Sequence, residues 1–181
     1  MSLPADWSGQ AVPQRLVGSV YLTDIDRTLL SMANRLSPRS ERDGQFDLRT
    51  GAKALVTAGS DVLLVRERHA DGTPFWTLPG GGVEPDETPT EGLRRELDEE
   101  LDCRARIAEP VDRFWYAHES LTETVSAYTV FDCSLLSTPD PNETEGIYDC
   151  RWVTASSLPS RTLPQVREIC KDVADVPGVV G

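Results

Sequence analysis

Apolar residues recur along the chain in short runs that predict β-strands. Two such runs, over residues 52–58 and 61–68, are separated by Gly59-Ser60, a pair that is typical of a hairpin turn. Comparable runs after residue 103 predict three further strands, over residues 104–118, 122–136 and 147–153. Between the two groups, residues 75–78 lead into three consecutive glycines.

A different spacing, between residues 88 and 103, predicts an α-helix. Leucines recur there every fourth residue and form one apolar stripe for the core. The stripe consists of Leu93, Leu97 and Leu101. Thr88 and Glu91 have the spacing of a capping box, and Pro89 between them takes the first helical position.

A second helix is predicted over about residues 163–173, because its apolar residues fall on one side. These residues are Val166, Ile169, Cys170 and Val173. The resulting order is two strands, a helix, further strands and a last helix. That order predicts an α/β fold with a mixed sheet between helices.

Residues 1–50 are interpreted as an N-terminal extension, and residues 51–181 as the main domain. Thr23 or Asp24 is a candidate cap for a helix in the extension. Its apolar side would carry Ile25, Leu29, Ala33 and Leu36. Three roles are open for the extension: a packed flank, a dimer contact that would make a homodimer, or a lid over the substrate.

Charge and cysteine content narrow the choice of partners. The net charge of −12 repels a nucleic-acid backbone, so long DNA or RNA is not expected to bind without a hidden basic patch. No apolar run is long enough to span a membrane, and no signal peptide is evident. The four cysteines lack CxxC spacing, which favours a reducing compartment, and we expect a cytoplasmic protein.

Three glutamates of the first predicted helix are the main candidate chemistry. Glu96, Glu99 and Glu100 stand at i, i+3 and i+4, so their carboxylates share one face. Like charges at this spacing cost a few tenths of a kcal/mol per pair, roughly. Oxygen-only ligands suit Mg²⁺ or Mn²⁺, which would offset that repulsion. A solvated acidic helix face is the alternative interpretation.

The segment around these glutamates resembles the Nudix box, G-x5-E-x7-R-E-U-x-E-E-x-G-U, where U is apolar. Gly81 and Glu87 take the first two fixed positions, and residues 95–100 match the R-E-U-x-E-E core. Six fixed residues coincide by chance on the order of 10⁻⁷ per start site at ordinary residue usage. Asp102 replaces the family's glycine, where we expect a left-handed helix end at a local cost.

The resemblance implies a Nudix-type α/β/α sandwich around a mixed sheet. It also implies hydrolysis of a nucleoside diphosphate linked to another group, with bound Mg²⁺ or Mn²⁺ and a small nucleotide as substrate. By the same resemblance, Glu96, Glu99 and Glu100 are the metal ligands. The base would be Glu96 if it lies in the box, and Glu145 if it lies outside.

The remaining candidate site residues have supporting roles. Arg95 is expected to orient the glutamates, and the family suggests Glu87 as its partner in a structural ion pair. The glycine-rich loop next to the helix is a candidate phosphate contact, because its backbone N–H groups are unobstructed. That loop is Gly80, Gly81 and Gly82. Trp76 and Tyr116 are candidates for base stacking, with the hydrophobic core as their alternative place.

The leaving group is not determined by the sequence. The family's ADP-ribose subgroup carries a proline some fifteen residues beyond the box, and residues 116–119 have none. A nucleoside triphosphatase, a nucleotide-sugar hydrolase and a dinucleoside polyphosphate hydrolase stay open. Two other classes are a nucleotide-binding module without turnover and an RNA-end pyrophosphohydrolase. The latter would need a basic channel.

Overall fold

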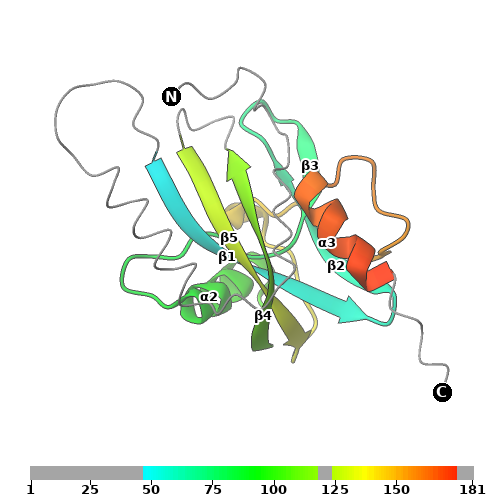
Figure 1. Ribbon diagram of the computed structural model, residues 1–181, viewed down its shortest axis with the longest axis horizontal. Coiled ribbons are helices and arrows are strands. Elements are labelled where there is room, and N and C mark those ends of the chain that lie inside the picture. Colours follow the sequence, from blue (N-terminus) through cyan, green and yellow to red (C-terminus); the bar gives the residue numbers. More distant parts are fainter. Residues whose placement is uncertain (1–46, 118–123, 175–181) are drawn as a thin grey trace. The chain divides into compact units, whose positions relative to one another are not determined.

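The computed structural model of the protein describes residues 47–117 and 124–174. The helix expected in the N-terminal extension lies outside these residues. The strands are β1 (Asp47–Ala58), β2 (Asp61–Arg68), β3 (Pro74–Thr77), β4 (Ala105–Ala117), β5 (Thr124–Leu135) and β6 (Asp149–Thr154). The helices are α2 (Pro89–Leu101), the short 3-10 helix η1 (Glu143–Glu145) and α3 (Pro164–Ala174) (Figure 1).

The six strands form a mixed sheet, as predicted. Its order is β3-β2-β1-β5-β4, and β6, outside this order, also pairs with β2. β1 runs parallel to β5, while the other pairings are antiparallel. β1 also joins the two halves of the sheet, because its last residues, Thr57 and Ala58, pair with β2.

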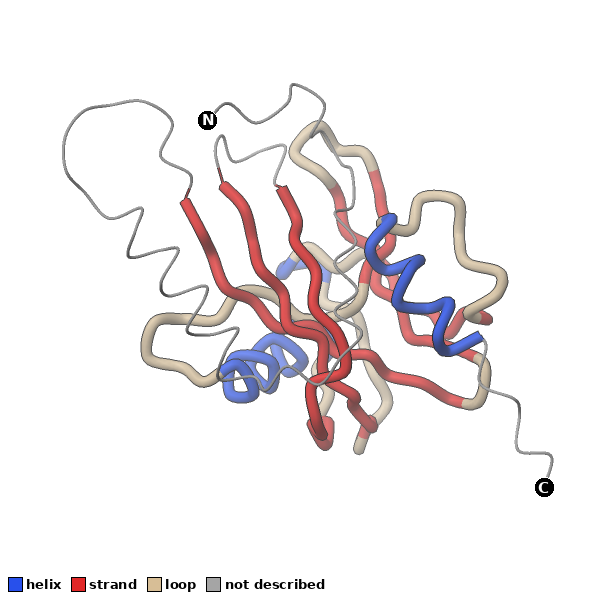
Figure 2. Tube along the Cα trace, in the orientation of Figure 1, coloured by secondary structure: helices blue, strands red, loops and turns tan. Residues whose placement is uncertain are grey.

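The two long helices cover opposite faces of β2 (Figure 2). Leu63 and Val65 belong to the core cluster that contains the leucine stripe of α2. Val62 and Leu64 belong to the cluster that contains the apolar side of α3. Successive strand residues point to opposite faces, so the sheet lies between the helices. This is the α/β/α arrangement that the sequence predicts.

Both ends of α2 form as their residues predict. The Thr88 hydroxyl accepts the Glu91 backbone N–H at 3.3 Å, and the Thr88 N–H donates to the Glu91 carboxylate at 2.9 Å. At the other end, Asp102 is left-handed, with φ 44° and ψ 39°, and its N–H reaches the Asp98 carbonyl at 2.9 Å. The aspartate thus takes the conformation expected of the family's glycine.

The strands differ most from the prediction in two places, while β4, β5 and β6 differ from it by one or two residues at their ends. β1 begins at Asp47 rather than at residue 52, because Leu48 to Thr50 pair with β5, far along the chain. β3 is not among the predicted strands, and its four residues pair with the end of β2. Within the described residues, no helix is long and apolar enough to cross a membrane.

Candidate metal and phosphate site

Arg95 is the centre of an ion-pair network on the open side of α2. Its Nε and Nη2 donate to the two Glu87 oxygens at 2.8 and 3.0 Å. Nη1 donates to Glu96 Oε1 and to Glu99 Oε2, each at 2.9 Å. Nη2 also reaches the Gly82 carbonyl at 2.9 Å. One guanidinium therefore contacts three carboxylates and fastens the glycine-rich loop to the helix.

Glu87 fixes the approach of the loop to α2. Its carboxylate accepts the Glu84 backbone N–H at 3.0 Å in addition to the two bonds from Arg95. The hydrogen bonds from Arg95, followed by the one from Glu84, lower the pKa of Glu87 to about 2. Its oxygen lies 3.0 Å from where a Cβ on Gly92 would stand, so Gly92 gives this carboxylate room against the helix.

Glu100 points away from Arg95, into the protein. Only 7% of its surface is exposed, and its Oε2 accepts the Gly80 N–H at 2.7 Å. Burial raises the pKa of Glu100 to about 7, although Lys53 opposes that rise. The Gly80 N–H is therefore already bonded to a carboxylate of the protein and is not free to contact a phosphate.

Lys53, from β1, is a buried cation beside this carboxylate. Its Nζ donates to the Gly80 carbonyl and lies 3.6 Å from Glu67 Oε1. Burial alone would lower the pKa of Lys53, but the negative charges of Glu67 and Glu100 outweigh it and raise that pKa. A cation in the middle of β1 thus partly compensates the charge of the acidic helix face.

The glycine-rich loop runs along β1 in hydrogen-bond contact. Ala52 donates its N–H to the Gly81 carbonyl, and Val83 donates to the Thr50 carbonyl, both at 3.0 Å. This path presses Gly81 against α2, because a Cβ there would lie 2.5 Å from Glu96 Oε2. Burial raises the pKa of Glu96, which is half-buried under the loop. A side chain at Gly81 would therefore displace the carboxylate.

The donors fit a hard divalent cation by type but are not gathered around one point. Among the described residues, no three His, Cys, Asp or Glu side chains lie close enough together to hold a metal ion. The hydrogen bonds explain this, because Glu96 and Glu99 contact Arg95 while Glu100 contacts Gly80. Glu99 has 45% of its side chain exposed, and an exposed ion pair of this kind contributes only about 0.3–0.5 kcal/mol.

The other candidates from the sequence lie outside α2 and the glycine-rich loop. Glu145 is exposed on η1, which is tied to the end of α2 by Asn142, whose Nδ2 donates to the Glu99 carbonyl at 2.9 Å. Trp76 is buried in the core cluster of α3, with Arg66 and Arg151 over its ring.

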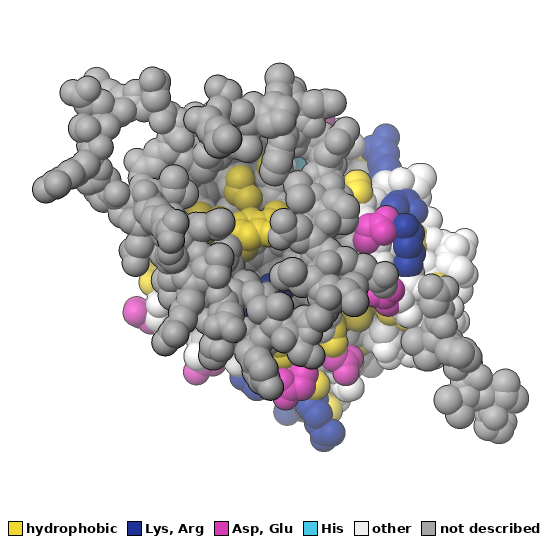
Figure 3. Space-filling view, in the orientation of Figure 1, with side chains coloured by type: hydrophobic (Ala, Val, Ile, Leu, Met, Phe, Trp, Pro, Cys, Tyr) yellow, Lys and Arg dark blue, Asp and Glu magenta, His cyan; other side chains and the backbone are white. Residues whose placement is uncertain are grey.

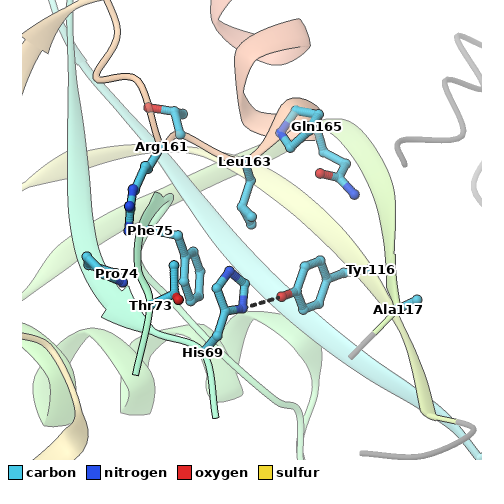
Figure 4. A pocket seen from close by; sticks show the side chains of 11 residues that line it. His69, Thr73, Pro74, Phe75, Tyr116, Ala117, Arg161, Leu163 and Gln165 are labelled. Carbon is cyan, nitrogen blue, oxygen red and sulfur yellow. Dashed lines mark hydrogen bonds between the residues drawn. The ribbon is translucent and has the colours of Figure 1, made fainter. Parts of the chain in front are cut away.

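Tyr116 lines two adjoining cavities beside the site. The smaller, of about 120 Å³, includes Lys53, Glu67 and Thr77 in its lining. The larger, of about 270 Å³, extends to Arg161 and Gln165 at the start of α3 (Figure 4). They share four lining residues, which are His69, Phe75, Tyr116 and Leu163. The cavities therefore extend from Lys53, the cation beside Glu100, to the start of α3.

Several residues of this region were not identified from the sequence. Lys53 interrupts an apolar strand run, and that interruption was an available signal. Glu67, Thr77 and Gln165 carried no comparable signal, because their importance depends on the cavity they line.

Relatives in sequence are nucleoside triphosphatases. NudI of Enterobacter sp. (strain 638) is 37% identical over 91 residues, which cover 46% of this chain and 64% of that protein. NudI of Escherichia coli O81 (strain ED1a) is 34% identical over the same length. The match spans slightly less than two thirds of these curated relatives.

Solved structures show the same fold at low identity. A MutT NUDIX hydrolase from Burkholderia pseudomallei matches with a TM-score of 0.62 and 21% identity, covering 69% of this chain and 97% of that one. A UDP-X diphosphatase matches with a TM-score of 0.56 and 24% identity, covering 83% of this chain and 79% of that one. The NUDIX domain model matches residues 47–173, most of the chain, and the protein therefore belongs to the Nudix hydrolase family.

Proposed function

We propose that the protein is a metal-dependent pyrophosphohydrolase that cleaves the pyrophosphate bond of a nucleoside diphosphate linked to another group. The observation that carries the proposal is the contact of the carboxylate helix with the glycine-rich loop. Glu100 accepts the Gly80 N–H, and Glu96 abuts Gly81. Lys53, which donates to the Gly80 carbonyl, lines the smaller cavity. Carboxylates and the cationic groups of Arg95 and Lys53 thus converge where a metal-bound anionic substrate could be handled.

Glu96, Glu99 and Glu100 are the proposed metal ligands. Nudix hydrolases generally use divalent ions, and bound Mg²⁺ or Mn²⁺ would neutralise the substrate and acidify the attacking water. Arg95 would orient Glu96 and Glu99, which must turn from its guanidinium to bind the ion. Glu96 remains the proposed base inside the box, and Glu145 the one outside it.

A nucleoside triphosphate is the substrate that we place first. The support is the relationship to NudI, which is named as a nucleoside triphosphatase and is 37% identical over the matched segment. The likeness to a UDP-X diphosphatase concerns the fold alone, so a nucleotide sugar comes second. A dinucleoside polyphosphate and ADP-ribose have no comparable support.

An RNA-end substrate is less favoured by the charges on the surface. Figure 3 shows acidic and basic side chains beside each other along the right and lower edges of the view. On the described part of this face the charge is therefore mixed, and the net charge of −12 also disfavours an RNA end, which would need a basic channel. The four free cysteines fit a cytoplasmic location, which stays a prediction, as does a homodimer.

A panel of nucleotides, assayed for released phosphate and pyrophosphate with Mg²⁺, with Mn²⁺ and with chelator, tests the proposal. We expect turnover of at least one nucleotide with the metal and none with chelator. For Glu→Gln variants of the proposed metal ligands, such as Glu99→Gln, the matched control is Glu168→Gln. Glu168 is an exposed glutamate on α3 whose partner is Lys171. Nucleotide binding without metal-dependent turnover would instead support a non-catalytic module.

A further inference from the structure

The C-terminal end of α2 is completed by a segment from a distant part of the chain. An α-helix leaves its last four backbone carbonyls without a partner inside the helix. In α2, the carbonyls of Glu99, Glu100 and Leu101 each accept a hydrogen bond from residues 140–142, which directly precede η1. The end of the acidic helix and the start of η1 therefore form one hydrogen-bonded unit.

Asn142 makes two of these three hydrogen bonds. Its backbone N–H donates to the Glu100 carbonyl, and its side-chain Nδ2 donates to the Glu99 carbonyl, both at 2.9 Å. The Asp140 N–H makes the third bond, to the Leu101 carbonyl at 2.7 Å. Glu99 and Glu100 are proposed metal ligands, so Asn142 is bonded to the backbone from which their carboxylates extend.

The same side chain also begins η1. Its Oδ1 accepts the Thr144 N–H at 3.1 Å. The Thr144 N–H can only donate and the Glu99 carbonyl can only accept, so these two partners assign the ends of the Asn142 amide. The Asn142 carbonyl accepts the N–H groups of Glu145 and Ile147, at 3.1 and 3.2 Å. Ile147 is buried in the core cluster of α2, so η1 is held at both ends.

Glu145, the last residue of η1, depends on this arrangement for its place. Its side chain is exposed, so packing in the core does not fix it. Moreover, η1 has only three residues, too few for a helix that holds its direction by itself. The hydrogen bonds of Asn142 are therefore the contacts that set where the backbone of Glu145 lies relative to α2.

We propose that Asn142 is a positioning residue of the proposed reaction. Its side chain holds η1 against the last turn of α2 and thereby fixes Glu145 relative to Glu99 and Glu100. The inference rests on the proposed function, in which Glu145 is the candidate carboxylate outside the acidic helix. It assigns a role to a side chain that is itself neither a metal ligand nor a base.

Asn142→Ser removes the bond to the Glu99 carbonyl and keeps the start of η1. Serine begins a helix about as well as asparagine does, but it lacks the amide that reaches α2. In the metal-free protein we expect the amides of residues 144–147 to exchange hydrogen about fivefold faster, with the centre of α2 unchanged. Thr144→Ala is the matched control, because it alters an exposed side chain on η1 and leaves both Asn142 side-chain bonds in place.

Steady-state kinetics then tests whether Asn142 acts through Glu145. We expect Glu145→Gln to lower kcat, and Asn142→Ser to lower it roughly tenfold with a smaller change in KM, because the lost function is orientation. In the Glu145→Gln background, Asn142→Ser should change kcat by less than about twofold, since residues that act through one another are not additive.

Three results would overturn the proposal. They are unchanged hydrogen exchange in Asn142→Ser, wild-type kcat in Glu145→Gln, and an equal loss from Asn142→Ser with and without the Glu145 carboxylate. The last result is what a purely structural role predicts. If Asn142→Ser does not fold, Asn142→Asp takes its place, because aspartate keeps the size and the acceptor oxygen and lacks the donor.

The same measurements separate this inference from the proposed function. Faster exchange in Asn142→Ser, with no hydrolysis of any nucleotide by wild type, would remove the enzymatic proposal and keep the joint between η1 and α2. Hydrolysis by wild type with unchanged exchange in Asn142→Ser would do the reverse.

Discussion

The acidic face of α2 and the cavities beside it satisfy their polar groups in different ways. On the helix, Arg95 and Gly80 supply protein partners to Glu96, Glu99 and Glu100. In the cavities, the buried oxygens of Thr77 and Gln165 have no hydrogen-bond partner among the described residues. The first region can exchange partners at low cost where it is exposed, whereas an unpaired buried oxygen costs stability.

The two regions therefore differ in how easily their polar groups can change partners. Ion pairs that are partly solvated can open to admit a cation and close again around Arg95. A buried acceptor such as Gln165 Oε1 is fixed by its own amide contact and offers one geometry only. The acidic face is therefore expected to rearrange when it binds a cation, and the buried oxygens in the cavity walls are expected to stay fixed.

Glu99→Gln should have the largest effect. We expect turnover to fall by several orders of magnitude with the fold retained, because a neutral amide is a poor ligand for a hard cation. Steady-state kinetics with Mg²⁺ measures the loss, and thermal unfolding checks the fold. Binding of nucleoside monophosphates in chelator should not change. Wild-type turnover in Glu99→Gln would show that Glu99 is not a metal ligand.

Gly81→Ala and Gly82→Ala form a matched pair on the glycine-rich loop. A Cβ on Gly81 would lie 2.5 Å from the Glu96 carboxylate, while one on Gly82 would meet nothing within 4 Å. We expect Gly81→Ala to lower kcat on the order of 100-fold, since a misplacement of about 1 Å at a reacting centre has that effect. Gly82→Ala should stay close to wild type. Similar activities in the two variants would show that the loop adapts.

Arg95→Lys tests whether the network needs the planar guanidinium with its several donors or only a positive charge. Lysine keeps the positive charge but cannot contact Glu87 through two parallel bonds while reaching Glu96 and Glu99. The expected result is a fall in kcat of roughly tenfold with a smaller change in KM, because the lost function is orientation. A change confined to KM would instead place Arg95 in substrate binding.

Glu87→Gln should give the smallest effect, visible in acid. The pKa of Glu87 is lowered in the folded state from an ordinary 4.5 to about 2, mainly by Arg95. A lowered pKa stabilises the folded protein above about 4.5, and that contribution is lost as the pH falls toward 2. Urea unfolding should therefore show a gap between wild type and Glu87→Gln near neutral pH that narrows below 4.5. A gap independent of pH would contradict this.

Local spacing along the chain determined much of the fold by itself. The capping box at Thr88, the leucine stripe of α2 and the helix end at Asp102 all involve residues within a turn or two of each other. The sequence also identified the acidic face and the glycine-rich loop, because they adjoin along the chain. Their contact, through Gly80 and Glu100, spans only 20 residues.

The tertiary structure alone decided what surrounds that face. Lys53 meets Gly80 across 27 residues, and Gln165 meets Trp115 across 50. The parallel pairing of β1 with β5 joins segments that share no local pattern. Periodicity reports which side of an element is buried, but not which distant element covers it. That choice depends on how the whole chain packs, and it is why the buried lysine and the cavity glutamine emerged only from the folded protein.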